Sequence, residues 1–390
     1  MGTPEEVATD SPDQADIRRL ARSLVEDLAG LDRLRELDEA ERFDEELYTA
    51  LAQAGLIGLG ADASAGRDSD PEHQIVVLEE LAAGPTSMAV CLVVQYMGVR
   101  LLCSFGTDEQ RRSLLAPLVD GRERVAFALS EADGGTDIAQ AMRTWARRTE
   151  EGWIVNGTKT WISGAATARH AIVLARTGPA EPSAIDGISA FVVPLDSRGL
   201  TVRRLGTVAI HGLDTCEIIF DDVALDGQAI LGEPDSGFRQ VIATLNGERL
   251  NAAASALGIA RGALTTATNY ARERTAFGRP IGAFQALQHA LADGAIKVEA
   301  ARGLLNRAAA AERGSDAAAV LSAMAKVAAA DAATSVTDTG MRVMGGAGLS
   351  REYPMQRFFR DARLYTFAPL TNEMLRNFVG ERWLALPRSY

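Results

Sequence analysis

Two glycine-rich segments have residue types that let a ligand approach the main chain. Residues 126–137, AFALSEADGGTD, run from an apolar stretch into hydroxyls, a carboxylate and two adjacent glycines. Residues 345–348, GGAG, form the second such place. Because glycine has no side chain, its backbone can come close to a flat, hydrogen-bonding molecule. An ordinary glycine-rich turn explains each pattern equally well when it is taken alone.

Two other segments carry aromatic and basic groups. Residues 159–164, KTWISG, place an indole beside a hydroxyl, a pattern that a strand with a buried tryptophan also explains. Residues 272–285, RERTAFGRPIGAFQ, place arginines and an aromatic ring at the end of a helical pattern. These arginines suit a phosphate-bearing partner, although the helix dipole also favours basic residues there.

Other types of chemistry find no support in the residue pattern. The sequence has no HExxH, P-loop or GxGxxG element, its four histidines are scattered, and its three cysteines form no CxxC pair. This argues against a metal site, a histidine-based triad and disulfides. The formal net charge of -12 disfavours a surface for nucleic acid or anionic membrane, because both need a basic face. An anionic ligand would therefore need a local basic pocket.

The location that the sequence predicts is the cytoplasm. Few and unpaired cysteines fit a reducing compartment, and the first ten residues are acidic where an export signal needs basic and then apolar residues. The uncharged segment 81–99 is long enough to be considered as a membrane helix, but Gly84 and Pro85 break it. A buried helix explains it better, so no membrane association is expected.

The ligand-binding segments need a scaffold, and the chain pattern divides that scaffold into three parts. A length of 390 residues exceeds the usual single core and implies more than one domain. Residues 1–122 are helical, and residues 235–390 are helical and alanine-rich. Residues 123–234 form short strands, with a polar turn expected at Glu150-Glu151-Gly152 and a tight hairpin turn at Asn156-Gly157. The clearest strands are residues 145–148, 153–155, 171–175, 190–193 and 217–220. An order of helix, sheet and helix predicts an α+β protein and disfavours a Rossmann fold.

Taken together and in this order, the segments resemble the acyl-CoA dehydrogenase family over essentially the whole chain. The matching elements are GTDEQ at 106–110, ALSEADGGTD, WIS, RERTAFGRPIGAFQ, and the run MGGAGLSREYPMQRFFRDAR at 344–363. The resemblance implies an α+β fold with an N-terminal helical domain, a β-barrel-like middle domain and a C-terminal helical bundle. It also implies a homo-oligomer, dimer or tetramer, that binds FAD between the β domain and the C-terminal helices.

Family members contact FAD through the positions that these motifs match. The first flavin-contacting strand and loop correspond to Phe127, Leu129, Ser130 and Thr136. The segment that covers the isoalloxazine ring corresponds to Trp161, Ile162 and Ser163. The positions that meet the FAD of a neighbouring subunit correspond to Arg274, Phe277, Gln285, Gly345 and Gly346. The C-terminal flavin contacts correspond to Thr371 and Glu373.

The sequence departs from the family pattern at the catalytic base. Family chemistry removes the α-proton of an acyl thioester with a carboxylate, while the β-hydrogen passes as hydride to flavin N5. Pro369 occupies the commonest base position, and it has neither a carboxylate nor the N–H that helps to polarise the thioester carbonyl. Glu248 matches the second base position, used by isovaleryl-CoA and long-chain enzymes, and is the expected base. An ion pair of Glu248 with Arg249 or a neighbouring helix is the alternative.

The resemblance also predicts the substrate contacts and the reaction. The implied substrate contacts are Thr136, Asn246, Arg249, Pro369 and Leu370, with the N–H of Leu370 replacing the missing donor. The expected activity is FAD-dependent α,β-dehydrogenation of an acyl thioester carried by CoA or a carrier protein. An electron-transfer flavoprotein or another acceptor would reoxidise the flavin. The unusual base favours branched, cyclic or carrier-bound acyl groups.

Pro369 leaves other activities of the same fold open. These are an enoyl-thioester reductase, a desulfinase-like enzyme and an N-hydroxylating flavin monooxygenase. A scaffold that keeps the fold and has lost the chemistry is a further alternative.

Overall fold

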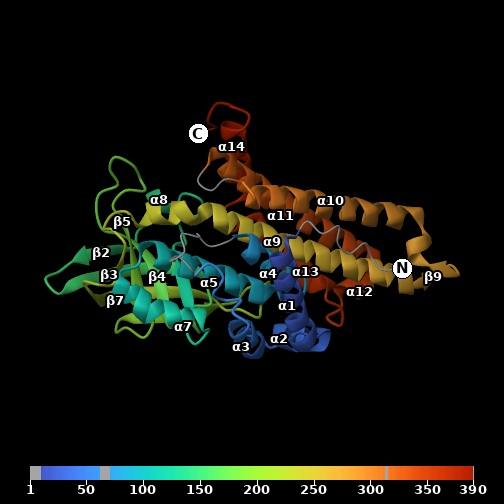
Figure 1. Cartoon of the computed structure of the whole chain (residues 1–390), viewed down its shortest axis with the longest axis horizontal. Coiled ribbons are helices and arrows are strands. Elements are labelled where there is room, and N and C mark those ends of the chain that lie inside the picture. Colours follow the sequence, from blue (N-terminus) through green and yellow to red (C-terminus); the bar gives the residue numbers. More distant parts are fainter. Residues whose placement is uncertain (1–9, 62–70, 312–314, 390) are drawn as a thin grey trace. The chain divides into compact units, whose positions relative to one another are not determined.

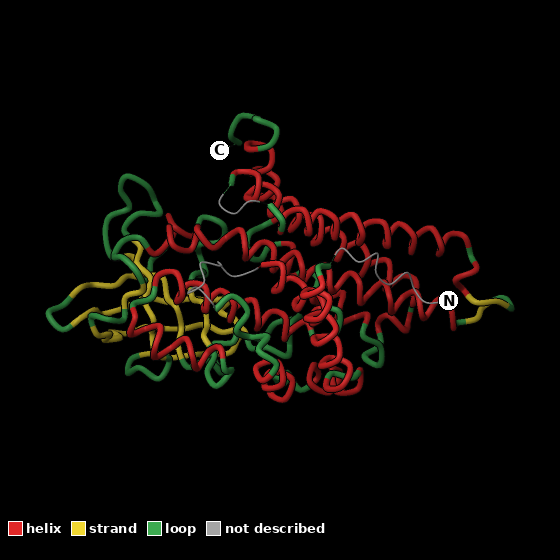
Figure 2. Tube along the Cα trace, viewed as in Figure 1, coloured by secondary structure: helices red, strands yellow, loops and turns green. Residues whose placement is uncertain are grey.

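The computed structural model describes residues 10–61, 71–311 and 315–389. The chain divides into two compact units (Figure 1). We call them the helical unit, comprising Met1–Glu39, Asp70–Ala89 and Asn246–Tyr390, and the β unit, comprising Ala40–Ser69 and Val90–Leu245. Apart from one short hairpin in the helical unit, the strands, yellow in Figure 2, belong to the β unit. The strands are therefore concentrated in one unit and the other unit is almost entirely helical, which confirms the predicted α+β class.

One sheet organises the β unit. Its strands follow the order β6-β7-β3-β2-β4-β5-β8, and β1 pairs in parallel with β4. The strands are β1 (Val125–Ala128), β2 (Trp145–Arg148), β3 (Gly152–Ser163), β4 (His170–Arg176), β5 (Ile188–Pro194), β6 (Leu200–Leu205), β7 (Thr215–Asp226) and β8 (Ile230–Leu231). The five expected strands all fall within β2, β3, β4, β5 and β7.

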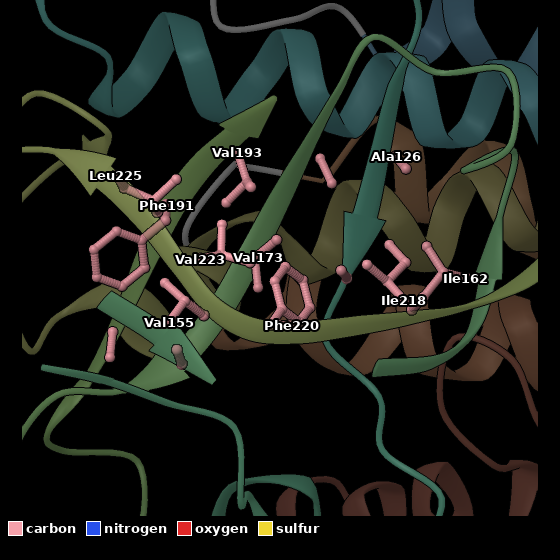
Figure 3. Packing of buried hydrophobic residues seen from close by; sticks show 14 of the residues in the cluster. Ala126, Val155, Ile162, Val173, Phe191, Val193, Ile218, Phe220, Val223 and Leu225 are labelled. Carbon is pink, nitrogen blue, oxygen red and sulfur yellow. The ribbon is translucent and has the colours of Figure 1, made fainter. Parts of the chain in front are cut away.

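The central strands are buried on both faces because successive side chains point to opposite sides of a sheet. In β4, Val173 belongs to one hydrophobic core and Leu174 to the other. Figure 3 shows the first core, to which Val173 of β4, Phe191 of β5 and Phe220 of β7 contribute. Helical residues such as Leu101 complete the second core. This two-sided burial explains why the strands read as nearly continuous apolar runs.

The expected hairpin turn at Asn156-Gly157 is wrong. Both residues lie inside β3, and the pairing of β3 with β7 shifts register between Val155 and Gly157. The turn that joins β2 to β3 is the polar turn expected at residues 150–152, which is confirmed and is closed by the Thr149 N–H donating to the Gly152 carbonyl. Gly157 has φ of 139°, and a Cβ there would stand 2.6 Å from Cα of Thr144. The glycine therefore permits a bulge and a close backbone approach instead of a chain reversal.

The remaining secondary structure of the two units is mostly helical. The β unit contains α3 (Glu45–Gln53), α6 (Asp108–Gln110), a π-helical turn (Arg111–Leu115), α7 (Ala116–Val119) and α8 (Ile138–Ala141). The helical unit contains α1 (Pro12–Leu28), α2 (Leu31–Glu39), α4 (Pro71–Ala82), β9 (Thr275–Ala276), β10 (Arg279–Pro280), a 3₁₀ turn (Ile281–Ala283), α10 (Gln285–Ala309), α11 (Asp316–Met344), α12 (Gly346–Leu349), α13 (Met355–Asp361), a second 3₁₀ turn (Leu364–Thr366) and α14 (Asn372–Arg382). The helices α5 (Thr86–Phe105) and α9 (Gly237–Glu273) each have residues in both units.

Two helices, α5 and α11, are long and apolar enough by length and composition to cross a membrane. About two thirds of their most apolar windows is buried within the protein, 67% in α5 and 61% in α11. Core helices of folded proteins pass the same test, as the sequence predicted for residues 81–99. The predicted break at Gly84 and Pro85 is confirmed, because α4 ends at Ala82 and α5 begins at Thr86.

A buried ionic cluster connects four helices of the helical unit. Glu79 and Glu80 lie on α4, and each side chain is only 4% exposed. Arg18 Nη1 of α1 lies 3.1 Å from Glu79 Oε2 and 2.8 Å from Glu80 Oε1; Arg302 of α10 and Arg261 of α9 each lie 2.8 Å from one of the two carboxylates. Burial alone would raise the pKa of Glu79, but the three arginines outweigh it and lower that pKa. The carboxylates are therefore held ionised between α1, α9 and α10.

Candidate active site

Glu248 lies on α9, in the part of this helix that belongs to the helical unit. The residue is half-buried, and burial raises the pKa of its carboxyl to about 7 against the opposing effect of Arg249. Within the described residues no hydrogen bond or ion pair holds this carboxylate, so the alternative of a structural ion pair with Arg249 is not formed. A carboxylate of this kind is suited to accept a proton near neutral pH.

Arg249, the next residue, is buried among three helices. Its guanidinium lies 5.2 Å from the ring centroid of Phe378 on α14, a cation–π contact. Its Nη1 lies 3.4 Å from Asn246 Oδ1 and 3.4 Å from the carbonyl oxygen of Ala319 on α11. Helices α9, α11 and α14 therefore meet around Arg249, the neighbour of Glu248 in the chain.

Helix α11 connects this place with the segment after Pro369. Ser322 Oγ lies 3.4 Å from Asn246 Oδ1. Four residues further along the same face, Lys326 donates to the carbonyl oxygen of Leu370 at 2.8 Å and to Asn372 Oδ1 at 2.7 Å. At 1.5 Å per residue, the step from Ser322 to Lys326 is about 6 Å along the helix axis. The predicted substrate residues Asn246, Arg249 and Leu370 are thus joined by one face of α11.

Pro369 lies in the short connection between the 3₁₀ turn that ends at Thr366 and α14. The hydroxyl of Thr371 caps α14 by accepting the Met374 N–H at 3.2 Å. Glu373 lies in the first turn of α14 with an exposed side chain. The two predicted C-terminal flavin contacts therefore sit at the N-terminus of a helix, an end that favours negatively charged groups.

In the β unit, the end of β1 and the middle of β3 are held together. Lys159 Nζ lies 3.0 Å from the carbonyl oxygen of Leu129 and 2.7 Å from Glu131 Oε1, and the Thr160 N–H donates to the Ser130 carbonyl at 2.9 Å. Burial lowers the pKa of Lys159 to about 8, although Glu131 opposes this. The structure therefore brings together the two segments that carry the predicted residues Leu129 and Ser130, and Trp161 to Ser163.

Trp161 is not a core residue, in contrast to one interpretation of the sequence. Its indole is 60% exposed and its backbone φ is 66°, whereas Ile162 beside it is buried in the first core. The bulge in β3 between Lys159 and Ile162 produces this arrangement. A large aromatic face open to solvent beside the hydroxyl-bearing Ser130 segment is suited to stack on a flat ring system.

The other predicted cofactor residues lie at exposed positions. Phe127 is half-buried and Thr136 is exposed in the β unit. Phe277, at the tip of the β9–β10 hairpin, is 94% exposed and makes an edge contact with Phe284 at a centroid distance of 6.0 Å. Arg274, Gln285, Gly345 and Gly346 are exposed as well. An aromatic ring that is so fully exposed is more typical of a surface that binds a partner or a ligand than of the solvent-exposed surface of a monomer.

Three residues that position these segments were not predicted from the sequence: Glu131, Lys159 and Lys326. Two of them stand inside segments that the sequence analysis selected, but only the fold shows which main-chain groups they hold. In the described ranges no group of three or more His, Cys, Asp or Glu side chains is arranged to hold a metal ion.

Three family models match in succession: the acyl-CoA dehydrogenase N-terminal domain over residues 11–122, the middle domain over 126–223 and the C-terminal domain over 235–384. One relative is the probable acyl-CoA dehydrogenase FadE25 of Mycobacterium tuberculosis, 38% identical over 347 residues, which cover 87% of this chain and 88% of the relative.

Two solved structures are similar over nearly their full length. Butyryl-CoA dehydrogenase from Megasphaera elsdenii has a TM-score of 0.90 and 32% identity, and the match covers 97% of this chain and all of that one. A glutaryl-CoA dehydrogenase from Mycobacterium smegmatis in complex with FADH2 has a TM-score of 0.90 and 25% identity, with 98% and 96% covered.

Proposed function

Because this chain belongs to the acyl-CoA dehydrogenase family, an FAD-dependent family of oxidoreductases that act on CH–CH groups, we propose that Glu248 is the base of its acyl-thioester dehydrogenation. FAD, when bound, supplies the acceptor for the β-hydride. The Glu248 carboxylate takes the α-proton, and Arg249 and Asn246 border the thioester. The acyl group enters as a CoA or carrier-protein thioester.

The observation that carries the proposal is the carboxylate of Glu248 itself. It is half-buried and without a hydrogen-bonding partner among the described residues, and its pKa is raised to about 7. The usual base position offers no alternative, because Pro369 cannot accept a proton. A base with a pKa near the working pH combines the reactive form with a strong driving force for proton transfer.

The residues of the β unit fit a flat cofactor. The exposed Trp161 face and the Ser130 and Ser163 hydroxyls come from segments joined by the Lys159 hydrogen bonds. Gly135 has a φ of 49°, with open space where a Cβ would stand, so the main chain is accessible there. These features support Phe127, Leu129, Ser130, Thr136, Trp161, Ile162 and Ser163 as FAD contacts.

The direct experiment is an anaerobic titration of the FAD-loaded protein with acyl thioesters, both CoA and carrier-protein forms, in which flavin bleaching is followed. We expect a branched, cyclic or carrier-bound acyl thioester to bleach the flavin. If no thioester in such a panel bleaches it, the dehydrogenase assignment fails, and a reductase, desulfinase-like or monooxygenase reaction would have to be considered.

The pH dependence of flavin reduction should follow the Glu248 carboxyl. Protonated Glu248 cannot accept the α-proton, so kcat/KM should be low near pH 5, rise with pH and level off above an apparent pKa of about 7. Stopped-flow reduction at a series of pH values measures this profile. The thioester should be one for which the chemical step limits flavin reduction. If the rate of reduction is then the same at every pH from 5.5 to 8, Glu248 is not the base.

The Lys159 hydrogen bonds should support FAD binding. In Lys159→Met the side chain keeps its length, but the Leu129 carbonyl loses its buried donor and Glu131 loses its cation. We expect FAD to bind about 10-fold more weakly, or ~1.4 kcal/mol. Titration of apoprotein with FAD measures this, with the exposed Lys297→Met as control. Equal affinity in both variants would mean that the Lys159 contact does not shape the cofactor site.

We further propose a homo-oligomer, a dimer or tetramer, in which Arg274, Phe277, Gln285, Gly345 and Gly346 of one subunit meet the FAD of another. The exposed Phe277 tip supports this proposal. Light scattering that returns a monomer for the FAD-loaded protein would contradict it. We also propose that an electron-transfer flavoprotein or another acceptor reoxidises the flavin, and that the protein is located in the cytoplasm.

A further inference from the structure

Lysine is rare in this chain, and two of its lysines are fully buried. Of 40 basic residues, lysines are only Lys159, Lys297 and Lys326. Both Lys159 and Lys326 have 0% exposure, whereas Lys297 is exposed. Arginine carries the positive charge almost everywhere else. A compact ammonium with three donors fits a narrow buried site where the broad guanidinium does not, so the two buried positions call for an explanation.

Lys326 donates hydrogen bonds to two acceptors just after Pro369, one on the main chain and one on a side chain. Its Nζ lies 2.8 Å from the carbonyl oxygen of Leu370 and 2.7 Å from Asn372 Oδ1. The Asn372 amide nitrogen is directed to Asp331 at 3.3 Å, and Asp331 pairs with Arg376 at 2.7 Å. The two acceptors bracket Thr371, so the path of residues 370–372 is fixed from α11.

Two main-chain N–H groups beside these hydrogen bonds, those of Leu370 and Thr371, have no acceptor among the described residues. In the described part of the chain, neither the Leu370 nor the Thr371 N–H donates a hydrogen bond. In a trans peptide the C=O and the N–H point in opposite directions. Because Lys326 holds the Leu370 carbonyl, the Thr371 N–H must point away from α11. A charge-assisted hydrogen bond to the carbonyl also polarises the peptide and makes its N–H a better donor.

We propose that Lys326 is a positioning residue that orients the free N–H group of Thr371 to replace the thioester-binding donor that Pro369 lacks. The inference rests on the proposed function of the same site. Lys326 itself touches neither the proton that moves nor the reacting carbons. It acts through the main chain, on the polarisation of the thioester carbonyl.

The test uses the FAD-loaded protein with the enoyl thioester product, which binds without further oxidation. Infrared difference spectra of product with ¹²C or ¹³C at the thioester carbonyl report how strongly that carbonyl is polarised. We expect a clear downshift on binding to the native protein and a smaller downshift in Lys326→Met. Reduction of the flavin by the saturated thioester should fall about 10- to 100-fold in kcat with little change in KM, because a transition-state contact is weakened.

Two further variants serve as a control and as a substitute for Lys326→Met. Lys297→Met removes the exposed third lysine, whose partner is Ser335, and should leave spectrum and rate unchanged. If Lys326→Met does not fold, Asn372→Ala removes one of the two acceptors and should give an intermediate downshift and rate. A native-like downshift and kcat in the variant would overturn the inference. A native protein that binds no enoyl thioester would instead overturn the proposed function.

Discussion

A Glu248→Gln variant is expected to bind FAD and acyl thioester but to reduce the flavin about 10²- to 10⁴-fold more slowly than the native protein. Glutamine keeps the shape of the side chain but cannot take a proton. No other carboxylate can replace it at the usual base position, since Pro369 stands there. Anaerobic stopped-flow absorbance measures the rate directly, and FAD content is read from the same spectrum.

A matched control lies on the same helix. Glu273 is an exposed carboxylate at the end of α9, and Glu273→Gln should reduce the flavin at the native rate. Native-rate reduction by Glu248→Gln would refute the assignment of the base. A loss of rate accompanied by loss of FAD would indicate a structural role, and thioester binding by the variant separates the two.

The same substitution should increase stability at alkaline pH. The folded-state pKa of Glu248 is raised to about 7, so ionising the carboxyl between about pH 4.5 and 7 destabilises the folded protein. Glu248→Gln should therefore melt at a higher temperature than the native protein at pH 8, and the difference should disappear below pH 4.5. Such a pattern is typical of a functional carboxylate that is retained at a cost in stability.

The second large effect is expected on folding. Glu79→Ala removes the buried carboxylate that faces Arg18, Arg261 and Arg302, and it leaves their charges without this partner. Removing one partner of a buried ion pair typically costs about 3–5 kcal/mol, enough to unfold much of the helical unit of a marginally stable protein. Chemical unfolding followed by circular dichroism measures the change.

Glu299→Ala supplies the control, because Glu299 pairs with the same Arg302 but its side chain is 66% exposed. An exposed ion pair contributes about 0–1 kcal/mol, so this variant should be nearly as stable as the native protein. If the two variants lose equal amounts of unfolding free energy, burial of Glu79 does not explain how much its ion pairs contribute to stability.

The fold could be predicted from the sequence because its signals are local. Strands such as β4 appear as short apolar runs, and the alanine-rich helices have a clear helical period. Asn156-Gly157 misled the prediction because the same dipeptide serves a hairpin turn and a bulge, and only the pairing of β3 with β2 and β7 distinguishes them.

The site could be predicted only in part. Glu248 and the segments proposed to contact flavin were selected from motifs and stay predictions, and burial raises the pKa of Glu248 as a base would need. The roles of Lys159 and Lys326 could not be predicted, because each acts on a carbonyl that is 30 or 44 residues away in the chain. Their burial depends on tertiary packing. The one sequence signal was the rarity of lysine beside abundant arginine.

Proton removal can be separated from hydride transfer by a thioester whose β-carbon carries no hydrogen, such as phenylacetyl-CoA. This compound can lose an α-proton but cannot be dehydrogenated, so any exchange reports the base alone. In D₂O, the FAD-loaded native protein should incorporate deuterium at the α-carbon, as measured by mass spectrometry, and Glu248→Gln with bound FAD should not. Exchange at the native rate in the variant would contradict Glu248 as the base that takes the α-proton.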